Sequence, residues 1–244
     1  MDFWRRREAG LAILAGWPLL ATAATPLRFA TDVNDQSGLA PAGRAVLGRA
    51  CERLGLTVRF EALPLRRSLR MTEQGHLDGE ALRIATVTHD HPSLLAVPVP
   101  LVTVRVVGYV RATGPVPQDW SLLETLRVGY PRGVVLLEKL GARLPHKVEA
   151  TNHADLMRLL RAQTIDIALL TLAAGQPEPD AALLADAVAL PAPLSVTPLH
   201  ALLHQRHREL LPRLAGVLQD MENSGEAARL RQAAWSAWAA SHSP

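Results

Sequence analysis

Charged side chains stand where the sequence changes from one predicted element to the next. Asp32 follows the apolar stretch 27–30, Arg67 opens a short helical pattern, and Arg83 lies at the edge of the extended stretch 77–84. A guanidinium group binds a carboxylate through two parallel hydrogen bonds, whereas a carboxylate accepts hydrogen bonds from amines and hydroxyls. We therefore predict that Arg67 and Arg83 bind the negative group of a small ligand, and that Asp32 orients a positive or hydroxyl group.

The second half of the chain adds three candidates. Tyr130 and Arg132 belong to the turn 129–133, which joins a predicted strand to a predicted helix, so free backbone amides are expected beside them. Thr171 follows the extended stretch 165–170. In open α/β sheets, ligands sit beyond the carboxyl ends of the strands. These three residues are expected to form the second wall of the site.

Some of these assignments have alternatives that the sequence leaves open. Arg67 could pair with Glu61 or Glu73 at the surface instead of contacting ligand. Asn34 or Asp35 could take the role of the aspartate that follows the first strand. Ion pairing and ligand binding use the same side-chain chemistry, so spacing alone does not separate them.

Three histidines raise the possibility of a metal site. On a helix, the spacing of His200, His204 and His207 would place all three on one face, as zinc ligands require. Pro198 precedes them, however, and the surrounding sequence fits an extended strand that returns between the two halves of the chain. A break from strand to helix would separate the three imidazoles, so we predict no metal.

A catalytic role has no specific motif. The sequence contains neither a G-x-S-x-G nucleophile elbow nor a glycine-rich phosphate loop. Cys51, the only cysteine, falls on the apolar side of a helical pattern. Asp32, Glu80 and Asp166 are carboxylates that a cleft enzyme could use, but nothing singles them out, and Arg83 could pair with an acid of its own lobe. We predict no catalytic residue and no cofactor.

The N-terminus has the three parts of a secretory signal. Basic residues precede an apolar run at about 11–20, and small residues follow at 21–23. That run is about half of the roughly 20 residues that a membrane-spanning helix needs. We predict a signal peptide over 1–23, cleaved after Ala23 or Ala24, and a periplasmic mature protein. An uncleaved anchor is the alternative.

Composition restricts the class of protein further. The formal net charge is +3 over 244 residues, without a concentrated basic face, so a nucleic-acid partner is not predicted. A single cysteine permits no internal disulfide, so the fold must be stabilised by its core even in an oxidising compartment. The mature chain of about 220 residues is long enough for one large core or two smaller ones. We expect a monomer.

Apolar periodicity predicts two α/β units. In each, strands alternate with helices, as in a parallel sheet covered by helices. The β-branched, proline-broken stretch 94–111 fits strands that cross between the units. The predicted strands are 27–30, 57–62, 77–84, 126–129, 146–150 and 165–170, and the predicted helices are 41–55, a short helix ending at Gly75, 133–140, 154–162 and a C-terminal helical region at about 208–238.

Short motifs in both units carry a family resemblance. They are Pro64-x-x-Arg67-x-Leu69, Gly75-x-x-Asp78-Gly79-Glu80, Arg83 and PSLLAVPVPL in the first unit, and LRVGYPRG, ADLMRLLRAQTIDIALL and HRELLPRLAGVLQDMENSG later. Their order and spacing, from about Leu27 to Trp235, resemble the family 3 bacterial extracellular solute-binding proteins, the periplasmic receptors of polar amino-acid-type ABC importers. The resemblance implies the type II periplasmic-binding-protein fold: two α/β lobes joined by a two-strand hinge, with ligand trapped between them. We predict lobe 1 at 24–108 plus 200–244 and lobe 2 at 109–199.

The sequence departs from this family at one informative place. Family members usually carry a Thr-x-x-Arg whose guanidinium clamps the α-carboxylate of an amino acid. The nearest match here is Thr88-His89-Asp90-His91, with His91 in place of the arginine. Histidine lacks the planar fork of a guanidinium, so ordinary amino-acid recognition does not follow from the resemblance. His89 and His91 add a second conceivable pair of metal ligands.

The resemblance implies a receptor that captures a small polar solute, anionic or amino-acid-like, for an ABC importer. The alternatives are a ligand-sensing subunit of a membrane sensor, or a cleft enzyme of the cyclohexadienyl dehydratase type. The expected partners are the solute and an ABC permease or membrane sensor.

Overall fold

The structure is a computed structural model that describes residues 25–33, 35, 38–114, 116–117, 120–132, 134–176 and 181–242. The predicted signal segment 1–23 and its cleavage site lie outside the described residues, as does Asn34. In the described part, no helix is both long and apolar enough to span a membrane.

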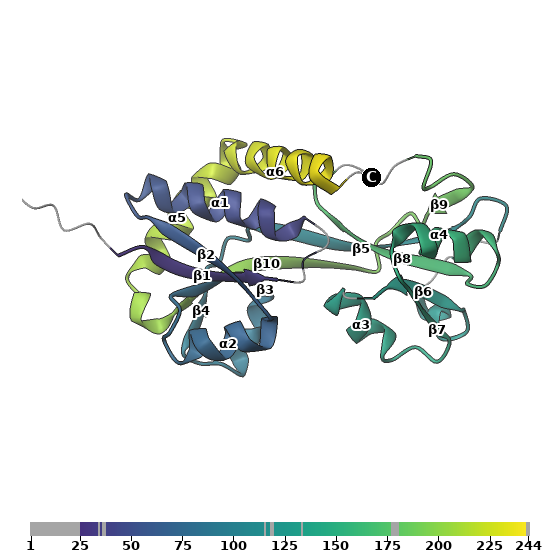
Figure 1. Ribbon diagram of the computed structural model, residues 1–244, viewed down its shortest axis with the longest axis horizontal. Helices are drawn as coiled ribbons and strands as arrows, with labels where there is room; N and C mark the ends of the chain where they lie inside the picture. The colour runs from purple at the N-terminus through teal and green to yellow at the C-terminus, as the bar shows by residue number, and fades with distance from the viewer. Residues whose placement is uncertain are drawn as a thin grey trace, which may run out of the picture.

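Lobe 1 is built on a sheet whose central strands run parallel in the order β2-β1-β3. Helices connect these strands, because parallel neighbours need a crossover connection. The elements are β1 (Leu27–Asp32), α1 (Leu39–Arg53), β2 (Val58–Leu63), α2 (Leu65–Glu73), β3 (Gly79–Arg83) and the short β4 (Leu94–Ala96). Figure 1 shows them on one side of the molecule, in the purple to blue colours of the N-terminal part.

Lobe 2 repeats the parallel arrangement in the order β8-β6-β7. Its elements are β6 (Val128–Pro131), α3 (Val135–Gly141), β7 (Lys147–Ala150), α4 (His153–Arg161), β8 (Ile167–Ala173) and β9 (Ala187–Ala189). The Asn152 side chain caps α4 by accepting a hydrogen bond from the Asp155 backbone amide at 2.8 Å, as expected for asparagine at this position.

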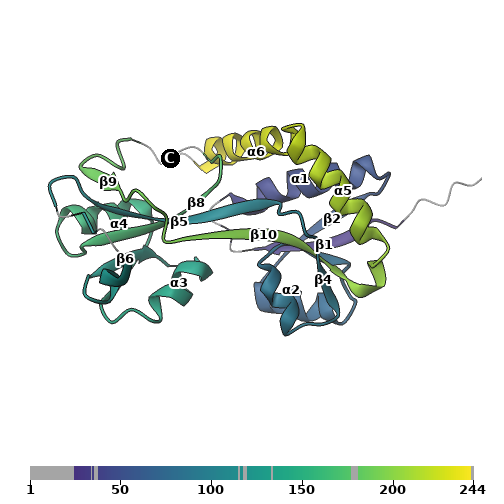
Figure 2. The ribbon, with the colours of Figure 1, turned by 180° about the vertical axis from the view of Figure 1, so that it is seen from behind.

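Two long strands run between the lobes (Figures 1 and 2). They are β5 (Val102–Arg111) and β10 (Ser195–His204). The first half of β10 pairs with β5, and its second half pairs with β3 and β4. One strand therefore belongs to both sheets, which gives the molecule two lobes and a hinge.

Each lobe has its own apolar core. In lobe 1, α1 packs with the C-terminal helices α5 (Leu210–Asn223) and α6 (Glu226–His242) over one face of the sheet. In lobe 2, alternate residues of β5 and β8 point to opposite faces, so Ile167 joins the cluster under α3 and Ala168 joins the cluster under α4. Separate cores allow the lobes to move as units.

The predicted two-lobe fold with a two-strand hinge is confirmed by this architecture. Every predicted strand and helix is present within a few residues of its expected bounds, and the stretch around Pro198 is the strand β10. The C-terminal helical region is two helices, because Gly225 takes a left-handed backbone conformation with φ of 71° between them. The short strand β9 and the 3₁₀ helices Ala85–His89, Trp120–Glu124 and Gln205–His207 were not predicted. The lobe boundaries stay a prediction.

Candidate functional site

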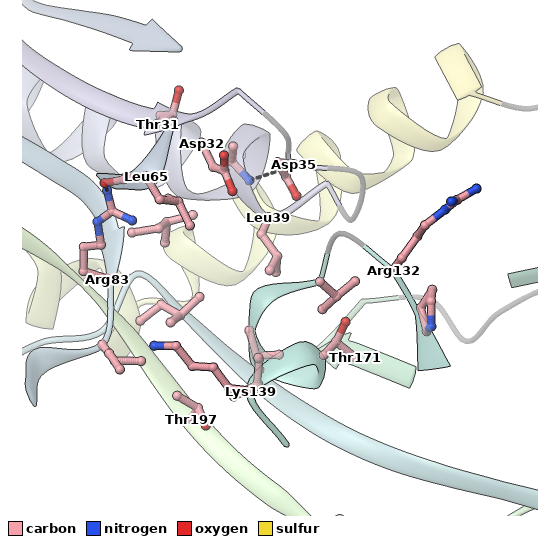
Figure 3. A pocket seen from close by; sticks show the side chains of 18 of the residues that line it. Thr31, Asp32, Asp35, Leu39, Leu65, Arg83, Arg132, Lys139, Thr171 and Thr197 are labelled. Carbon is pink, nitrogen blue, oxygen red and sulfur yellow. Dashed lines mark hydrogen bonds between the residues drawn. The ribbon is translucent and has the colours of Figure 1, made fainter. Parts of the chain in front are cut away.

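A pocket of about 400 Å³ lies where the two lobes and the crossing strands meet. Figure 3 shows side chains from all three parts of the molecule around it. Lobe 1 contributes Thr31, Asp32, Asp35, Leu39, Ala40, Leu65, Leu82, Arg83, Ile84 and Val87; the crossing strands contribute Val104, Thr197 and Leu199; lobe 2 contributes Pro131, Arg132, Val134, Leu136, Lys139, Thr151, Asn152, His153 and Thr171. The volume suits a small organic molecule.

The lobe 1 wall is organised around a buried ion pair. Glu80, on β3, is 1% exposed, and its carboxylate accepts a hydrogen bond of 2.5 Å from Nη2 of Arg83. Ser68 and Thr72, on the buried face of α2, donate their hydroxyls to the same carboxylate at 3.2 and 2.9 Å. A buried carboxylate needs such partners, because its desolvation would otherwise cost several kcal/mol. The network holds α2 against β3.

The Arg83 side chain keeps donor capacity beyond this network. All of its hydrogen bonds to described residues come from Nη2, which also donates to the Leu65 carbonyl at 3.0 Å and the Ser68 hydroxyl at 2.7 Å. The side chain is 10% exposed, and its Nε is buried without an acceptor in the described structure. Figure 3 places the guanidinium at the Leu65 end of the pocket. Arg83 is therefore both a structural ion-pair partner and part of the pocket wall.

The loop that follows β1 forms another part of the lobe 1 wall. One carboxylate oxygen of Asp35 accepts a hydrogen bond from the Ala40 backbone amide at 2.6 Å, drawn as a dashed line in Figure 3. This contact supplies an acceptor to the first turn of α1, where backbone amides lack partners within the helix. Asp32 and Asp35 both line the pocket and are partly exposed.

The lobe 2 wall carries cations on exposed side chains. Arg132 follows β6, and Lys139 projects from α3 into the pocket, directed toward the side on which Thr197 and Arg83 lie (Figure 3). Neither Arg132 nor Lys139 forms an ion pair with a described residue. Among the described lining residues, this lobe contributes no acidic side chain. The lobe 2 wall is positively charged.

The lobe 2 wall also carries a neutral imidazole. Desolvation by surrounding protein atoms lowers the pKa of His153 below its usual 6.5, although solvent still reaches much of the side chain. Since deprotonation is favoured, the ring is neutral at pH 7 and can donate or accept a hydrogen bond. His153 adds polarity without adding charge.

The predicted ligand-binding residues divide into two groups. Asp32, Arg83, Arg132 and Thr171 all line the pocket. Arg67 does not line it, because α2 turns Ser68 and Thr72 inward and leaves Arg67 exposed.

Tyr130 is the second predicted residue that does not line the pocket. Strand β6 extends through Pro131, and Tyr130 points into the lobe 2 core, where it is 1% exposed. Its hydroxyl lies 3.3 Å from a carboxylate oxygen of Glu149. Desolvation, together with the negative charge and hydrogen bond of Glu149, raises the pKa of Tyr130. Its role in this structure is packing.

Sequence reasoning did not single out Lys139. It stands in the apolar pattern VLLEKLG, where a lysine is expected simply to face solvent. One available signal was its rarity, since the 244 residues contain only two lysines, Lys139 and Lys147.

The histidines considered as metal ligands do not converge. Nδ1 of His200 lies 2.8 Å from the Val97 carbonyl, and Nε2 of His207 lies 2.5 Å from a carboxylate oxygen of Asp78. His91 contacts Glu73 at 3.1 Å and does not line the pocket. In the part of the chain that the structure describes, no three histidine, cysteine or acidic side chains form a cluster able to hold a metal ion.

The carboxylates considered for catalysis are also dispersed. Glu80 is enclosed in its ion pair, and Asp166 receives hydrogen bonds from Arg127 away from the pocket. Of the three acids, only Asp32 lines the pocket. Burial raises the pKa of the Cys51 thiol to about 12, so this thiol is not a nucleophile at neutral pH.

Half of the described lining residues are aliphatic or proline, and none of them is phenylalanine, tyrosine or tryptophan. Such a surface favours the body of an aliphatic ligand, whereas the few charged groups fix its orientation. The arrangement can therefore enclose a small molecule that has one polar end.

Comparison with known proteins identifies the class to which this architecture belongs. No family model matches the chain, and no curated protein matches it by sequence. A histidine kinase sensor domain with similarity to periplasmic binding proteins superposes with a TM-score of 0.57 at 19% identity, over 86% of this chain and 95% of that one. The GluR0 ligand-binding core in complex with L-glutamate superposes with a TM-score of 0.61 at 11% identity, over 86% of this chain and 97% of that one. An amino-acid ABC transporter substrate-binding protein from Streptococcus pneumoniae bound to L-arginine has a TM-score of 0.59 at 13% identity, over 87% of this chain and 95% of that one.

These likenesses establish the type II periplasmic-binding-protein fold over most of the chain. The fold expected from the resemblance to family 3 solute-binding proteins is thus confirmed, and it is typical of extracytoplasmic binding proteins and sensor domains. At these identities the ligand does not carry over from one protein to another.

Proposed function

We propose that this protein is a periplasmic receptor that captures a small solute between its lobes and presents it to an ABC importer. The observation that carries the proposal is the pocket at the seam, which takes its wall from both lobes and from both crossing strands. A ligand that contacts both lobes favours the conformation in which the walls are close together. Closure removes water, which strengthens the hydrogen bonds to its charged groups.

The pocket residues have distinct roles in this proposal. Arg83, Arg132 and Lys139 provide positive charge, Asp32 accepts a hydrogen bond from an amine or hydroxyl of the solute, and Thr171 adds a hydroxyl on the lobe 2 side. The aliphatic residues between them cover the body of the solute. N-terminal processing of the segment 1–23 would release the mature receptor into the periplasm.

Closure is directly measurable. Spin labels on Arg66→Cys, in α2, and Arg143→Cys, just after α3, would report the distance between two exposed positions on different lobes. The native Cys51 is fully buried and does not compete for the label. We expect one solute from a panel of acids, amines, amino acids and sugars to shorten this distance and to raise the melting temperature. A distance that stays unchanged with every solute would contradict solute capture.

A sensor role is the second candidate. The similarity to a histidine kinase sensor domain favours it, since the same two-lobe closure can signal instead of deliver. The two roles differ in the partner. Pull-down with the solute-loaded protein would recover a permease in one case and a membrane sensor in the other.

A cleft enzyme of the cyclohexadienyl dehydratase type is the third candidate. Incubation with prephenate and arogenate, followed by detection of the aromatic product, tests it. We expect no turnover, because Glu80 and Asp166 do not line the pocket, and the second acid that does, Asp35, already accepts a hydrogen bond from the Ala40 amide.

A further inference from the structure

One lysine of the pocket wall has a side chain without a partner among the described residues. Arg83 and Glu80 form a buried pair whose charges cancel, whereas Asp32 and Asp35 lie on the lobe 1 wall and each has an interaction partner, among them the neutral Ala40 amide for Asp35. Lys139 is different, because no described residue forms an ion pair or hydrogen bond with its side-chain amine. Its amine is directed toward the wall that contains Arg83 (Figure 3). Arg132 also lacks an ion pair among the described residues, but its side chain points away from Arg83, so Lys139 is the pocket cation that faces that wall (Figure 3).

Arg83 offers hydrogen-bond donors on the opposite wall. Its Nη2 is saturated by protein acceptors, but Nη1 makes no hydrogen bond to a described residue, and Nε is buried without an acceptor. An orphaned donor in a side chain that is 10% exposed costs free energy until an acceptor arrives. A group with two acceptor oxygens and one negative charge could contact Arg83 and Lys139 together.

The remaining wall limits the charge and shape of such a ligand. Leu65, Leu82, Val104, Leu136 and Leu199 line the same pocket. A phosphate with two negative charges would lose its hydration among these side chains with few donors to replace it, at a large free-energy cost. A carboxylate carries one charge, and an aliphatic body attached to it would bury apolar surface against the leucines.

We propose that the pocket binds a small aliphatic monocarboxylate whose carboxylate lies between Arg83 and Lys139. This inference rests on the proposed solute capture and specifies its ligand class and the residue that selects it. Lys139 gives the charge selection, since Arg83 is already neutralised by Glu80. The carboxylate becomes enclosed when lobe 2 brings Lys139 toward lobe 1.

Calorimetric titration tests the ligand class. The probes are C4–C6 aliphatic carboxylates, plain or with a 2-amino, 2-hydroxy or 2-oxo group, each compared with its neutral amide. We expect at least one acid to bind at least tenfold more tightly than its amide. Lys139→Met should weaken the binding of that acid at least tenfold and leave the melting temperature of the protein unchanged. Lys139→Arg should keep most of the affinity for the acid. Lys147→Met is the matched control, because it removes the other lysine of lobe 2, which does not line the pocket.

The scarcity of lysine gives an independent spectroscopic test. Reductive methylation with ¹³C-formaldehyde keeps the positive charge and labels two lysines and the N-terminal amine. We expect the bound acid to shift the methyl signal of Lys139 and to leave that of Lys147 unchanged, with assignments from the two methionine variants.

The outcomes separate the inference from solute capture. If amines, sugars or amides bind and close the lobes but no acid does, the monocarboxylate assignment is overturned while capture stands. If an acid binds equally to wild type and Lys139→Met, the role of Lys139 is overturned. If no probe of any class binds or closes the lobes, capture itself fails.

Discussion

The two lobes begin with the same structural device, an arginine–aspartate pair that joins the first and third parallel strands. In lobe 1, a carboxylate oxygen of Asp78 accepts the Arg28 backbone amide at 2.7 Å, and the Asp78 amide donates to the Arg28 carbonyl at 2.8 Å. In lobe 2, Asp166 and Arg127 make the same two contacts at 2.9 and 2.8 Å. One local solution is thus used twice in the chain.

The pairs differ in what their side chains reach. The Arg127 guanidinium closes on Asp166 itself, at 3.0 and 2.6 Å. The second oxygen of Asp78 is instead contacted by Arg206 and His207, which follow β10 at the far end of the sequence. The lobe 2 pair is self-contained, whereas the lobe 1 pair also ties the returning chain to the sheet.

The strands that follow these aspartates show a second difference. The second residue after the aspartate is Glu80 in lobe 1 and Ala168 in lobe 2. The fifth residue after it is Arg83 in lobe 1 and Thr171 in lobe 2. Lobe 1 therefore builds an ion pair into its wall, while lobe 2 keeps this strand neutral and brings charge from the exposed Lys139. We infer that the lobe 1 wall is pre-organised and the lobe 2 wall can adapt.

The strongest test of this contrast removes the buried acid. Glu80→Ala leaves the Arg83 charge buried without its partner, so we expect the free energy of unfolding to fall by about 3–5 kcal/mol. Urea denaturation measures the change. The control is Glu61→Ala, which removes an exposed ion pair with Arg28 and should cost about 1 kcal/mol or less. Equal losses in the two variants would refute the pre-organised wall.

A second test adds one methyl group at the edge of the same strand. A Cβ on Gly79 would lie 2.2 Å from the Leu202 carbonyl oxygen and 2.4 Å from the Phe29 ring. Because the backbone carbonyl cannot move aside, Gly79→Ala should cost about 3 kcal/mol. For comparison in lobe 2, a Cβ on Gly129, in β6, would have side-chain atoms of Ile165 and Leu156 as its nearest neighbours, so Gly129→Ala should cost about 1 kcal/mol.

Phe29→Val in the Gly79→Ala background should restore little stability in thermal melts, because the Leu202 carbonyl is still in place. Recovery of wild-type stability in that double variant would show that the ring, and not the strand pairing, causes the clash.

The third test uses pH to compare the two aspartates. Burial alone would raise the pKa of Asp78, but hydrogen bonds from the Arg28 amide, Arg206 and His207 lower it below 3.8. A lowered native pKa stabilises the fold above the unfolded-state pKa, and this stabilisation is lost as the pH falls through the native pKa. Asp78→Asn should therefore lose about 2 kcal/mol at pH 7 and show a flatter stability curve below pH 4.

Asp166 provides the matched comparison. Arg127 lowers the pKa of Asp166 in the same direction, but Asp166 is 28% exposed against 13% for Asp78. We expect Asp166→Asn to cost about 1 kcal/mol at pH 7. A larger loss than for Asp78→Asn would contradict the view that the returning chain makes the lobe 1 pair the stronger one.

The smallest effect is expected at the adaptable wall. Arg132 has no ion pair in the described structure, so Arg132→Ser should change the free energy of unfolding by less than about 0.5 kcal/mol. Solute affinity, measured by calorimetry, should decrease severalfold and become less sensitive to salt. A large loss of stability would show that Arg132 has a structural role.

Much of the fold could be predicted from sequence because each element has a clear apolar period and a turn at its end. Gly75 and Gly225 mark helix ends by positive φ. The site was less predictable. Tyr130 fails to reach the pocket because β6 runs two residues further than its apolar pattern indicates, and the ring points into the core. The partner of Arg83 depends on α2 burying hydroxyls against β3, a tertiary contact that no local spacing encodes.

The double membership of β10 has a consequence for the order in which the molecule is assembled. During synthesis, β6, β7 and β8 are complete before β10 emerges, whereas β3 has only β1 beside it until residues 200–203 of β10 are made. The lobe that is translated first is therefore finished last, and until then the edge of β3 stays open to pairing with other strands.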